Sequence, residues 1–276
     1  FGLKEIKDFF ISKENKEIKN YKDLYLNASN LDIRIGLHQK YSQNPQPWFE
    51  WIYEQLNLKE KDEVLELGCG TGELWKNKNL PKNVHVTLSD QSQGMVKDAR
   101  KYVGDGNGQI FYQMIDCRKI PKDDQSFDKV IANHVLFYLD DRQQVFNEIK
   151  RVLKQNGTFI CSTYGSSHMQ EITQLIKDFD ERITLSDHKL YNVFGLENGE
   201  EQLKKVFSQV KEIDYEDELL VDQPEPLISY ILSCHGNQHE YLNHRYLEFK
   251  DFVRKKMAAK GVIKITKSAG IFICKP

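Results

Sequence analysis

Glycines at three alternating positions form the clearest chemical motif in this sequence. The apolar segment Glu63–Leu67 runs directly into Gly68-Cys69-Gly70-Thr71-Gly72. Because glycine has no Cβ, the backbone of such a loop can lie directly against a ligand. A dinucleotide-binding fingerprint would need its third glycine at position 73, where a helix N-terminus meets the pyrophosphate. Position 73 is Glu, which would repel phosphates there, so the loop favours a nucleoside ligand that lacks a pyrophosphate.

A carboxylate at the end of the next predicted strand narrows the choice further. Residues 84–88 are apolar enough for a strand, and Asp90 follows about 20 residues after the glycine loop. In open α/β sheets an acid at this place hydrogen-bonds the ribose hydroxyls, at the carboxyl ends of the strands. Taken alone, Asp90 could equally cap the helix that begins near Gln91. Its distance from the glycine loop makes the ribose role the better interpretation.

Four motifs in order resemble those of the class I S-adenosylmethionine-dependent methyltransferases, in the branch that includes the ubiquinone-type C-methyltransferases. The resemblance is strong over roughly residues 60–165, and the flanks fit only by position. The segments that carry it are Glu66-Leu67-Gly68-Cys69-Gly70-Thr71-Gly72, Leu88-Ser89-Asp90 with Gly94-Met95, Ile115-Asp116-Cys117, and Ser126-Phe127-Asp128-Lys129-Val130-Ile131-Ala132-Asn133.

The resemblance implies S-adenosylmethionine as cofactor and assigns residues to it. Those residues are Glu66, Gly68, Cys69, Gly70, Asp90, Gln91, Met95, Asp116, Cys117, Asn133 and His134. Asp90 is expected on the ribose hydroxyls, Asp116 on the adenine exocyclic amine, and the backbone carbonyl of Asn133 on the methionine ammonium. Three alternatives stay open: Glu66 bonding within its own turn, Met95 as a core residue, and Asp116 as a turn carboxylate.

The N-terminal segment offers two further cofactor contacts by the same resemblance. Related enzymes often close the site with an N-terminal helix that carries an aromatic and a basic residue toward the cofactor carboxylate. Arg34 and Tyr41 fit that role, because they lie about two helical turns apart on one face. A solvated arginine and a core tyrosine are the alternative. Trp48 and Trp51 are predicted to be packing residues.

Methyl transfer is an in-line displacement in which the cofactor supplies the electrophile, so no metal is needed. The candidates for catalysis are His134, His168 and Tyr164, since both histidines follow predicted strand ends and histidine is the usual base near neutral pH. Each histidine could instead be structural. Other acceptor contacts are expected from Phe137, Tyr138 and the aromatic residues of segment 224–260. The sequence Ala132-Asn133-His134-Val135 departs from the Asn/Asp-Pro-Pro-Tyr/Phe motif of adenine and glutamine methyltransferases and argues against those substrates.

Alternating short apolar strands and helical segments predict an α/β fold with helices on both faces of a mostly parallel sheet. Strands are expected near 63–67, 84–88, 109–114, 127–132, 157–163 and 210–221, with the last formed from 263–265 and 270–274. Helices are expected near 72–78, 92–102, 141–154 and 167–180. The resemblance implies a Rossmann-like sheet of seven strands with the last strand antiparallel.

Three regions are expected along the chain. Residues 1–57 should form an N-terminal helical cap, interrupted at Asn44-Pro45-Gln46-Pro47, and 58–223 with 261–276 the Rossmann-like core. Residues 224–260 should form a helical insertion, or lid, before the last strand. An ordinary helical pair packed on one sheet face is the alternative for that insertion.

Composition limits the partners that the chain can have. With 276 residues, 39% of them hydrophobic, it can bury one large core, and a formal charge of −2 disfavours nucleic acid. Five scattered cysteines indicate free thiols in a reducing cytoplasm. No apolar run is long enough for a membrane span. We therefore expect a cytoplasmic monomer or homodimer that methylates a small organic molecule.

Other functions compatible with the same motifs stay open. A nucleoside-binding regulator without turnover would have the same cofactor site. An NAD-dependent oxidoreductase is disfavoured by Glu73 and by the Asp116 motif, and a tRNA or protein methyltransferase is a minor alternative.

Overall fold

The predicted alternation of strands and helices folds into one seven-stranded sheet in the computed structural model, which describes residues 28–186 and 189–276. The strand order is β3-β2-β1-β4-β5-β7-β6, and only β7 runs antiparallel to its neighbours. The strands are β1 (Glu63–Leu67), β2 (His85–Asp90), β3 (Ile110–Met114), β4 (Phe127–Asn133), β5 (Leu153–Tyr164), β6 (Gln209–Val221) and β7 (Ile263–Lys275). The expected fold class is therefore confirmed.

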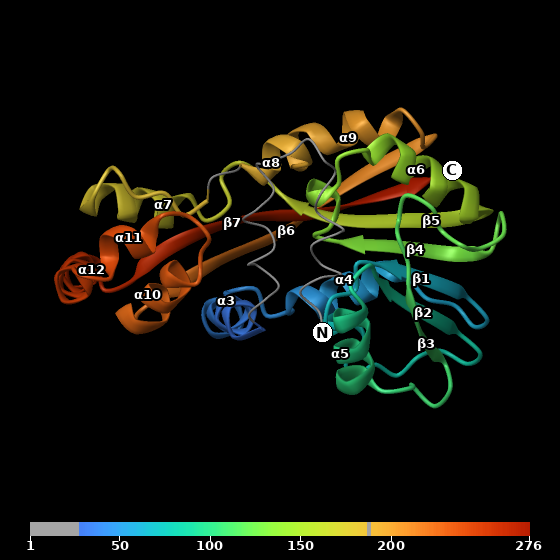
Figure 1. The fold of residues 1–276 in the computed structure, drawn as a ribbon, viewed down its shortest axis with the longest axis horizontal. Coiled ribbons are helices and arrows are strands. Elements are labelled where there is room, and N and C mark those ends of the chain that lie inside the picture. Colours follow the sequence, from blue (N-terminus) through green and yellow to red (C-terminus); the bar gives the residue numbers. More distant parts are fainter. Residues whose placement is uncertain (1–27, 187–188) are drawn as a thin grey trace.

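Helices cover both faces of this sheet (Figure 1). One face carries α6 (Arg142–Val152), α8 (Leu190–Val193) and α9 (Leu196–Lys204); the other carries α4 (Trp48–Leu56) and α5 (Gln93–Val103). The central strands are almost wholly buried, as in β1, where the last four of five residues are inaccessible. Near-continuous apolar runs of this kind are typical of parallel strands that are covered on both sides.

Strands β6 and β7 are longer than the rest of the sheet requires. They pair with each other from Gln209↔Lys275 to Val221↔Ile263, whereas β5 pairs with β7 only as far as Tyr164↔Ala269. Their far halves, residues 216–221 and 263–268, therefore leave the sheet as a two-stranded ribbon. We call this part the β6–β7 ribbon; Figure 1 shows it reaching away from β1–β3.

Five helices gather around the β6–β7 ribbon and supply the apolar partners that an isolated two-stranded ribbon lacks. They are α3 (Ala28–Tyr41), α7 (Gln170–Phe179), α10 (Pro224–Leu232), α11 (Gln238–Leu242) and α12 (Tyr246–Lys260). Leu219 and Ile265 from the ribbon share one buried cluster with Leu227 and Phe249 from these helices. Segment 224–260 therefore lies between β6 and β7 in the chain and packs on the ribbon.

Several element boundaries differ from the expectation. The helix expected over 72–78 is the short 3₁₀ helix η2 (Glu73–Trp75), and strand β5 begins at Leu153, inside the helix expected over 141–154. Helices α8 and α9 were not expected. The break at Asn44-Pro45-Gln46-Pro47 is confirmed, because α3 ends at Tyr41 and α4 begins at Trp48. Expectations for residues 1–27 lie outside the described residues. Within the part that is described, no helix is both long and apolar enough to cross a lipid bilayer.

Candidate functional site

One large cavity opens at the carboxyl ends of the central parallel strands and continues toward the β6–β7 ribbon. Its volume is about 940 Å³, and its wall includes the glycine loop, Asn133 at the end of β4, Tyr164 at the end of β5 and Lys267 in β7. Helix α3 and Tyr230 of α10 close the side that faces the ribbon. The carboxyl edge of an open α/β sheet is where such folds bind ligands.

Most of the predicted site residues meet at this cavity. Those on its wall are Arg34, Glu66, Gly68, Cys69, Gly70, Asp90, Gln91, Met95, Cys117, Asn133, His134, Tyr164 and His168. Phe137 and Tyr138 also line it, as the sequence predicted for acceptor contacts. Of the aromatic residues in segment 224–260, only Tyr230 reaches the wall within the described chain.

Gly68 and Gly70 of the glycine loop have different surroundings. Gly68 has φ +68°, and a Cβ there would lie 2.5 Å from Val135 Cγ2. Gly70 has φ +54°, but a Cβ there would meet nothing within 4 Å. The backbone N–H of Cys69 donates to the Ser89 carbonyl at 2.8 Å and ties the loop to β2. The bare backbone of Gly70 therefore faces the cavity, while Gly68 is required by the turn.

Asp90 holds the glycine loop and the start of α5 together. Its Oδ2 accepts from the Gly70 backbone N–H at 3.2 Å, and its Oδ1 accepts from the Ser92 N–H at 2.8 Å. Burial raises the pKa of Asp90 from its ordinary value, although these N–H groups act in the opposite direction. Each carboxylate oxygen can accept another hydrogen bond from a ligand hydroxyl.

Glu66 is buried behind the loop, and both of its carboxylate oxygens already have protein donors. Trp75 Nε1 donates to Oε2 at 2.7 Å and Asn133 Nδ2 donates to Oε1 at 3.1 Å. Burial raises the pKa of Glu66 to about 7 despite these two hydrogen bonds. Glu66 therefore orients the loop and the end of β4, through side-chain donors and not through the amides of its own turn.

Asn133 and Ser162 fix the backbone where β4 ends. The Ser162 hydroxyl donates to Asn133 Oδ1 at 3.1 Å and accepts from the His134 backbone N–H at 3.0 Å. His134 itself has φ +50°, an uncommon conformation for a residue with a side chain. This network turns the chain after β4 so that the His134 ring faces the cavity wall.

Aromatic rings form a continuous series from the end of β4 to α3 along the cavity. His134 stacks on Trp48 with ring centroids 5.4 Å apart and lies 6.2 Å from Tyr164. Tyr164 lies 5.2 Å from His168, which stacks on His38 at 6.2 Å. The faces of these aromatic rings form a largely apolar surface that could hold a planar ligand.

Burial keeps the three cavity histidines neutral. Burial, and then the positive charge of Lys267, lower the pKa of His134 to about 4 and that of His38 to about 3. The pKa of His168 is also held well below its ordinary value, mainly by burial and then by the other two histidines. At neutral pH these side chains can donate or accept one hydrogen bond at each ring nitrogen.

Four buried polar atoms on the cavity wall have no hydrogen-bond partner among the described residues. They are Gln91 Oε1, Trp48 Nε1, His38 Nδ1 and His168 Nδ1. Burying such atoms without partners costs about 1–3 kcal/mol each, so native structures normally satisfy them with a ligand or water. Gln91 lies beside Asp90, whereas His38 and His168 lie in the part that faces the ribbon. Both ends of the cavity therefore have free hydrogen-bonding capacity.

A buried ion pair supports the cavity wall where the ribbon begins. Lys267 of β7 pairs with Asp217 of β6, and the two side chains are 7% and 0% exposed. Asp217 also accepts from the Ser42 hydroxyl at 2.6 Å and from the backbone N–H of Asn44 at 3.0 Å. The pair therefore joins the ribbon to the segment between α3 and α4.

Three residues lie elsewhere in the structure than the sequence suggested. Asp116 is not on the cavity wall, and its carboxylate forms a bidentate pair with Arg118. Those hydrogen bonds hold the pKa of Asp116 below its ordinary value although partial burial acts the other way. Tyr41 packs in the buried cluster on the ribbon, with its hydroxyl 3.5 Å from Gln223 Oε1. Trp48, expected to be a packing residue, lines the cavity.

Two basic side chains of the cavity wall, His38 and Lys267, were not among the predicted site residues. His38 lies one helical turn after Arg34 in a segment that had been singled out, so the spacing of four could have revealed it. Lys267 is one of three lysines in β7, and no local pattern distinguishes it from the other two. Within residues 28–186 and 189–276, no group of histidine, cysteine, aspartate and glutamate side chains could hold a metal ion.

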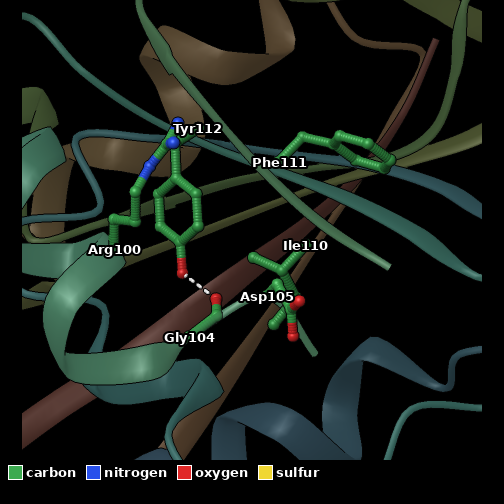
Figure 2. Close-up of a pocket in the computed structure, with 6 residues that line it drawn as sticks. All are labelled: Arg100, Gly104, Asp105, Ile110, Phe111 and Tyr112. Atoms are coloured by element: carbon green, nitrogen blue, oxygen red, sulfur yellow. Dashed lines mark hydrogen bonds between the residues drawn. The ribbon is translucent and has the colours of Figure 1, made fainter. Parts of the chain in front are cut away.

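A second, smaller hollow lies on the edge strand β3 (Figure 2). Its wall includes Arg100 and Asp105, and the Tyr112 hydroxyl donates to the Gly104 carbonyl at 2.5 Å. The Arg100 guanidinium lies 5.1 Å from the centre of the Tyr112 ring. These polar groups already have partners, and the loop 104–105 leads into the amino end of β3. The hollow is therefore the weaker candidate for a site.

Because the cavity histidines are buried and neutral, we expect the folded protein to lose stability in mild acid. An unfolded histidine has a pKa near 6.5, whereas His38 and His134 have folded pKa values of about 3 and 4. Between pH 6.5 and 4.5 the unfolded chain therefore binds more protons, and the free energy of unfolding falls as the pH is lowered. Glu66, whose folded pKa of about 7 exceeds its ordinary 4.5, and Asp90, whose pKa burial also raises, oppose this, but they are two groups against three.

Thermal unfolding followed by circular dichroism between pH 7 and pH 4.5 would measure the effect. We expect the melting temperature to fall steadily, and to fall less steeply in the His38→Gln variant. A melting temperature that stays constant or rises over this interval would contradict the prediction.

Comparison with known proteins gives consistent results. Residues 65–161 match a family model described as a methyltransferase domain. The chain is 32% identical to the putative methyltransferase YrhH of Bacillus subtilis over 135 residues, which are 46% of this chain and 72% of that protein. It is 21% identical to malonyl-(acyl-carrier protein) O-methyltransferase 1 of Ilyobacter polytropus over 218 residues, 75% of this chain and 78% of that protein.

The chain is also similar to a third relative over a shorter stretch of sequence, and to a solved structure in fold. The chain is 31% identical over 119 residues to the ubiquinone/menaquinone biosynthesis C-methyltransferase UbiE of Desulfotalea psychrophila. That match covers 42% of this chain and 47% of the relative, so it spans about half of that enzyme. A putative methyltransferase structure from Bacillus halodurans is similar in fold, with a TM-score of 0.53 and 16% identity over 83% of this chain and 98% of that one.

Proposed function

The chain belongs to the class I S-adenosylmethionine-dependent methyltransferases, and from this premise we propose that it transfers a methyl group from S-adenosylmethionine to a small organic acceptor. Methyltransferases of this kind use S-adenosylmethionine. The observation that carries the proposal is the single cavity of about 940 Å³ that contains both the glycine loop with Asp90 and the aromatic series. A volume of this order can hold a nucleoside cofactor together with a small acceptor.

The residues at the loop end fit the adenosyl part of the cofactor. Gly70 offers bare backbone with open space beside it, and Asp90 has acceptor capacity for two hydroxyls. Gln91 has a buried carbonyl oxygen without a protein partner, which a donor on the ligand could satisfy. Met95 and Cys117 line the same part and would flank the adenine ring. We propose these residues as the adenosyl site.

The chemistry of the transfer would come from the cofactor, whose sulfonium supplies an electrophilic methyl group when bound. The chain has to position the acceptor in line with that methyl group and to exclude water. The backbone at Asn133, fixed by Glu66 and Ser162, is proposed to orient the methionine part. The rings of His134 and Tyr164 would form the wall against which the acceptor is held.

The cavity histidines are better suited to hydrogen bonding than to proton removal. A base with a pKa near 4, as His134 has, takes a proton from an alcohol or an ammonium group only weakly at neutral pH. We therefore propose that His134, His168 and Tyr164 contact the acceptor as neutral groups that position it.

The other functions have less support. Glu73 lines the cavity at the loop, where it would repel the pyrophosphate of a nicotinamide dinucleotide. The formal charge of −2 gives no support for a tRNA substrate. A regulator that binds the nucleoside without turnover would share the cofactor site, so only a transfer assay separates it from an enzyme.

Two measurements test the proposal. Isothermal titration calorimetry should show binding of S-adenosylhomocysteine and no binding of NADH. Incubation with S-adenosylmethionine labelled on its methyl group and a metabolite extract should place the label in the small-molecule fraction, with heat-denatured protein as the control. Binding of S-adenosylhomocysteine without any transfer would favour the regulator, and binding of NADH alone would overturn the proposal.

A further inference from the structure

Arg34 places a positive charge at the end of the cavity that faces the β6–β7 ribbon. It lies on α3, and its Nη1 donates to Nε2 of His235, which follows α10, at 3.0 Å. Its charge also acts on Tyr230 and Cys234, both of which belong to the segment between β6 and β7. The guanidinium is therefore held by the insertion.

The charge of Arg34 has no negative partner among the side chains of residues 33–186 and 189–276. No carboxylate among these side chains forms an ion pair with it, and the imidazole nitrogen that accepts its hydrogen bond carries no proton. A guanidinium keeps its proton in proteins and presents a planar fork that matches a carboxylate. The other cation on the cavity wall, Lys267, is neutralised by Asp217. Arg34 is thus the cavity cation whose charge is left for a ligand.

The two ends of the cavity differ in charge. Near the glycine loop the wall contains the acidic residues Glu66 and Asp90. Toward the ribbon it contains Arg34 and the neutral His38, one helical turn later, whose buried Nδ1 lacks a partner. An anion at the ribbon end would both neutralise Arg34 and satisfy His38. Between the two ends lie the flat rings of Tyr164 and His168.

We propose that the methyl acceptor is a small carboxylic acid with a flat, apolar body, whose carboxylate is bound by Arg34 and His38 at the ribbon end of the cavity. This inference rests on the proposed function, because it places the cofactor at the glycine loop. It also gives Arg34 a different role from the cofactor carboxylate contact that the sequence suggested. The rings of Tyr164 and His168 would hold the body of the acid, with its far end directed toward Asn133.

Binding of a charged probe and its neutral analogue tests the proposal. Phenylacetate and phenylacetamide have nearly the same shape and differ in charge. Calorimetric titration of the protein saturated with S-adenosylhomocysteine should show phenylacetate binding about tenfold or more tightly, because a charge-assisted hydrogen bond contributes about 1.5–3 kcal/mol.

Variants of arginine residues assign the preference to one side chain. Arg34→Gln should remove the preference for the acid and leave the affinity for S-adenosylhomocysteine within about twofold. Arg254→Gln is the control, because Arg254 of α12 pairs with Glu225 at the surface and does not line the cavity. It should change neither affinity. Arg34→Lys retains the charge and should keep part of the preference for the acid. This variant allows the test to be made even if Arg34→Gln does not fold.

The possible outcomes distinguish this inference from the proposed function. Equal affinities for acid and amide, or no binding of phenylacetate, would overturn the carboxylate proposal while S-adenosylhomocysteine still binds. A loss of S-adenosylhomocysteine affinity in Arg34→Gln, as large as the loss for the acid, would return Arg34 to the cofactor. Failure of the unaltered protein to bind S-adenosylhomocysteine would overturn the proposed function, and the inference with it.

Discussion

Replacing Asp90 by alanine is expected to weaken S-adenosylhomocysteine binding about 100-fold, whereas replacing Asp116 by alanine should change it less than about threefold. Two ribose hydroxyls donating to the Asp90 carboxylate would together contribute about 3 kcal/mol, which corresponds to that factor. Asp116 faces Arg118 and is not on the cavity wall. The two acids thus form a matched pair, which calorimetric titration of both variants compares directly.

Asp90 also orders the loop, so its replacement needs a control for structure. Its carboxylate accepts from the N–H groups of Gly70 and Ser92, and an alanine would release both. Asp90→Asn keeps one of the two acceptor oxygens and should lose less affinity, and less thermal stability, than Asp90→Ala. Equal affinities for the Asp90→Ala and Asp116→Ala variants would remove the basis for the ribose assignment.

Replacing Lys267 by methionine should lower the free energy of unfolding by about 3–5 kcal/mol. The side chain of its partner Asp217 is shielded from solvent, and removing one member of such a pair leaves an uncompensated charge. Hydrogen bonds from Ser42 and Asn44 to Asp217 remain, and they place the expected loss toward the lower end of this range. Urea denaturation followed by circular dichroism would give the value.

The neighbouring pair on the same two strands provides the control. Lys264 and Glu218 also join β7 to β6, but their side chains are 64% and 36% exposed. Lys264→Met should therefore cost less than about 1 kcal/mol. The double variant Asp217→Asn with Lys267→Met should recover part of the loss, because it removes the unpaired charge. Similar losses in Lys264→Met and Lys267→Met would contradict the assignment of a buried pair.

Local patterns in the sequence were sufficient for the strands and for the loop end of the cavity. The apolar run of β1, the alternating glycines and the carboxylate some 20 residues later are all short-range features. Each reflects a physical need that acts over a few residues, such as a backbone without Cβ atoms or a strand buried on both faces. His134 and His168 could be placed near the site for the same reason, because the ends of parallel strands meet at one edge.

The tertiary structure alone decided which side chains on one helix or turn face the cavity. Arg34 and Tyr41 lie seven residues apart and share a face by helical periodicity, yet Tyr41 meets the ribbon and joins its buried cluster. Likewise, Asp116 has a cation two residues away, and that pairing competes with the predicted contact to a ligand. The spacing of residues along a helix specifies which side chains share a face, whereas the groups that each side chain contacts come from distant segments.

The ribbon end of the cavity depends entirely on such distant segments. Lys267 meets Asp217 through the register of two long antiparallel strands, and Arg34 meets His235 across 201 residues of sequence. No local sequence pattern predicts these two contacts, because they depend on how five helices pack on the β6–β7 ribbon. The sequence by itself therefore determined the fold class and identified candidates for the nucleoside end, and only the packed structure decided the charge and shape of the space left for the acceptor.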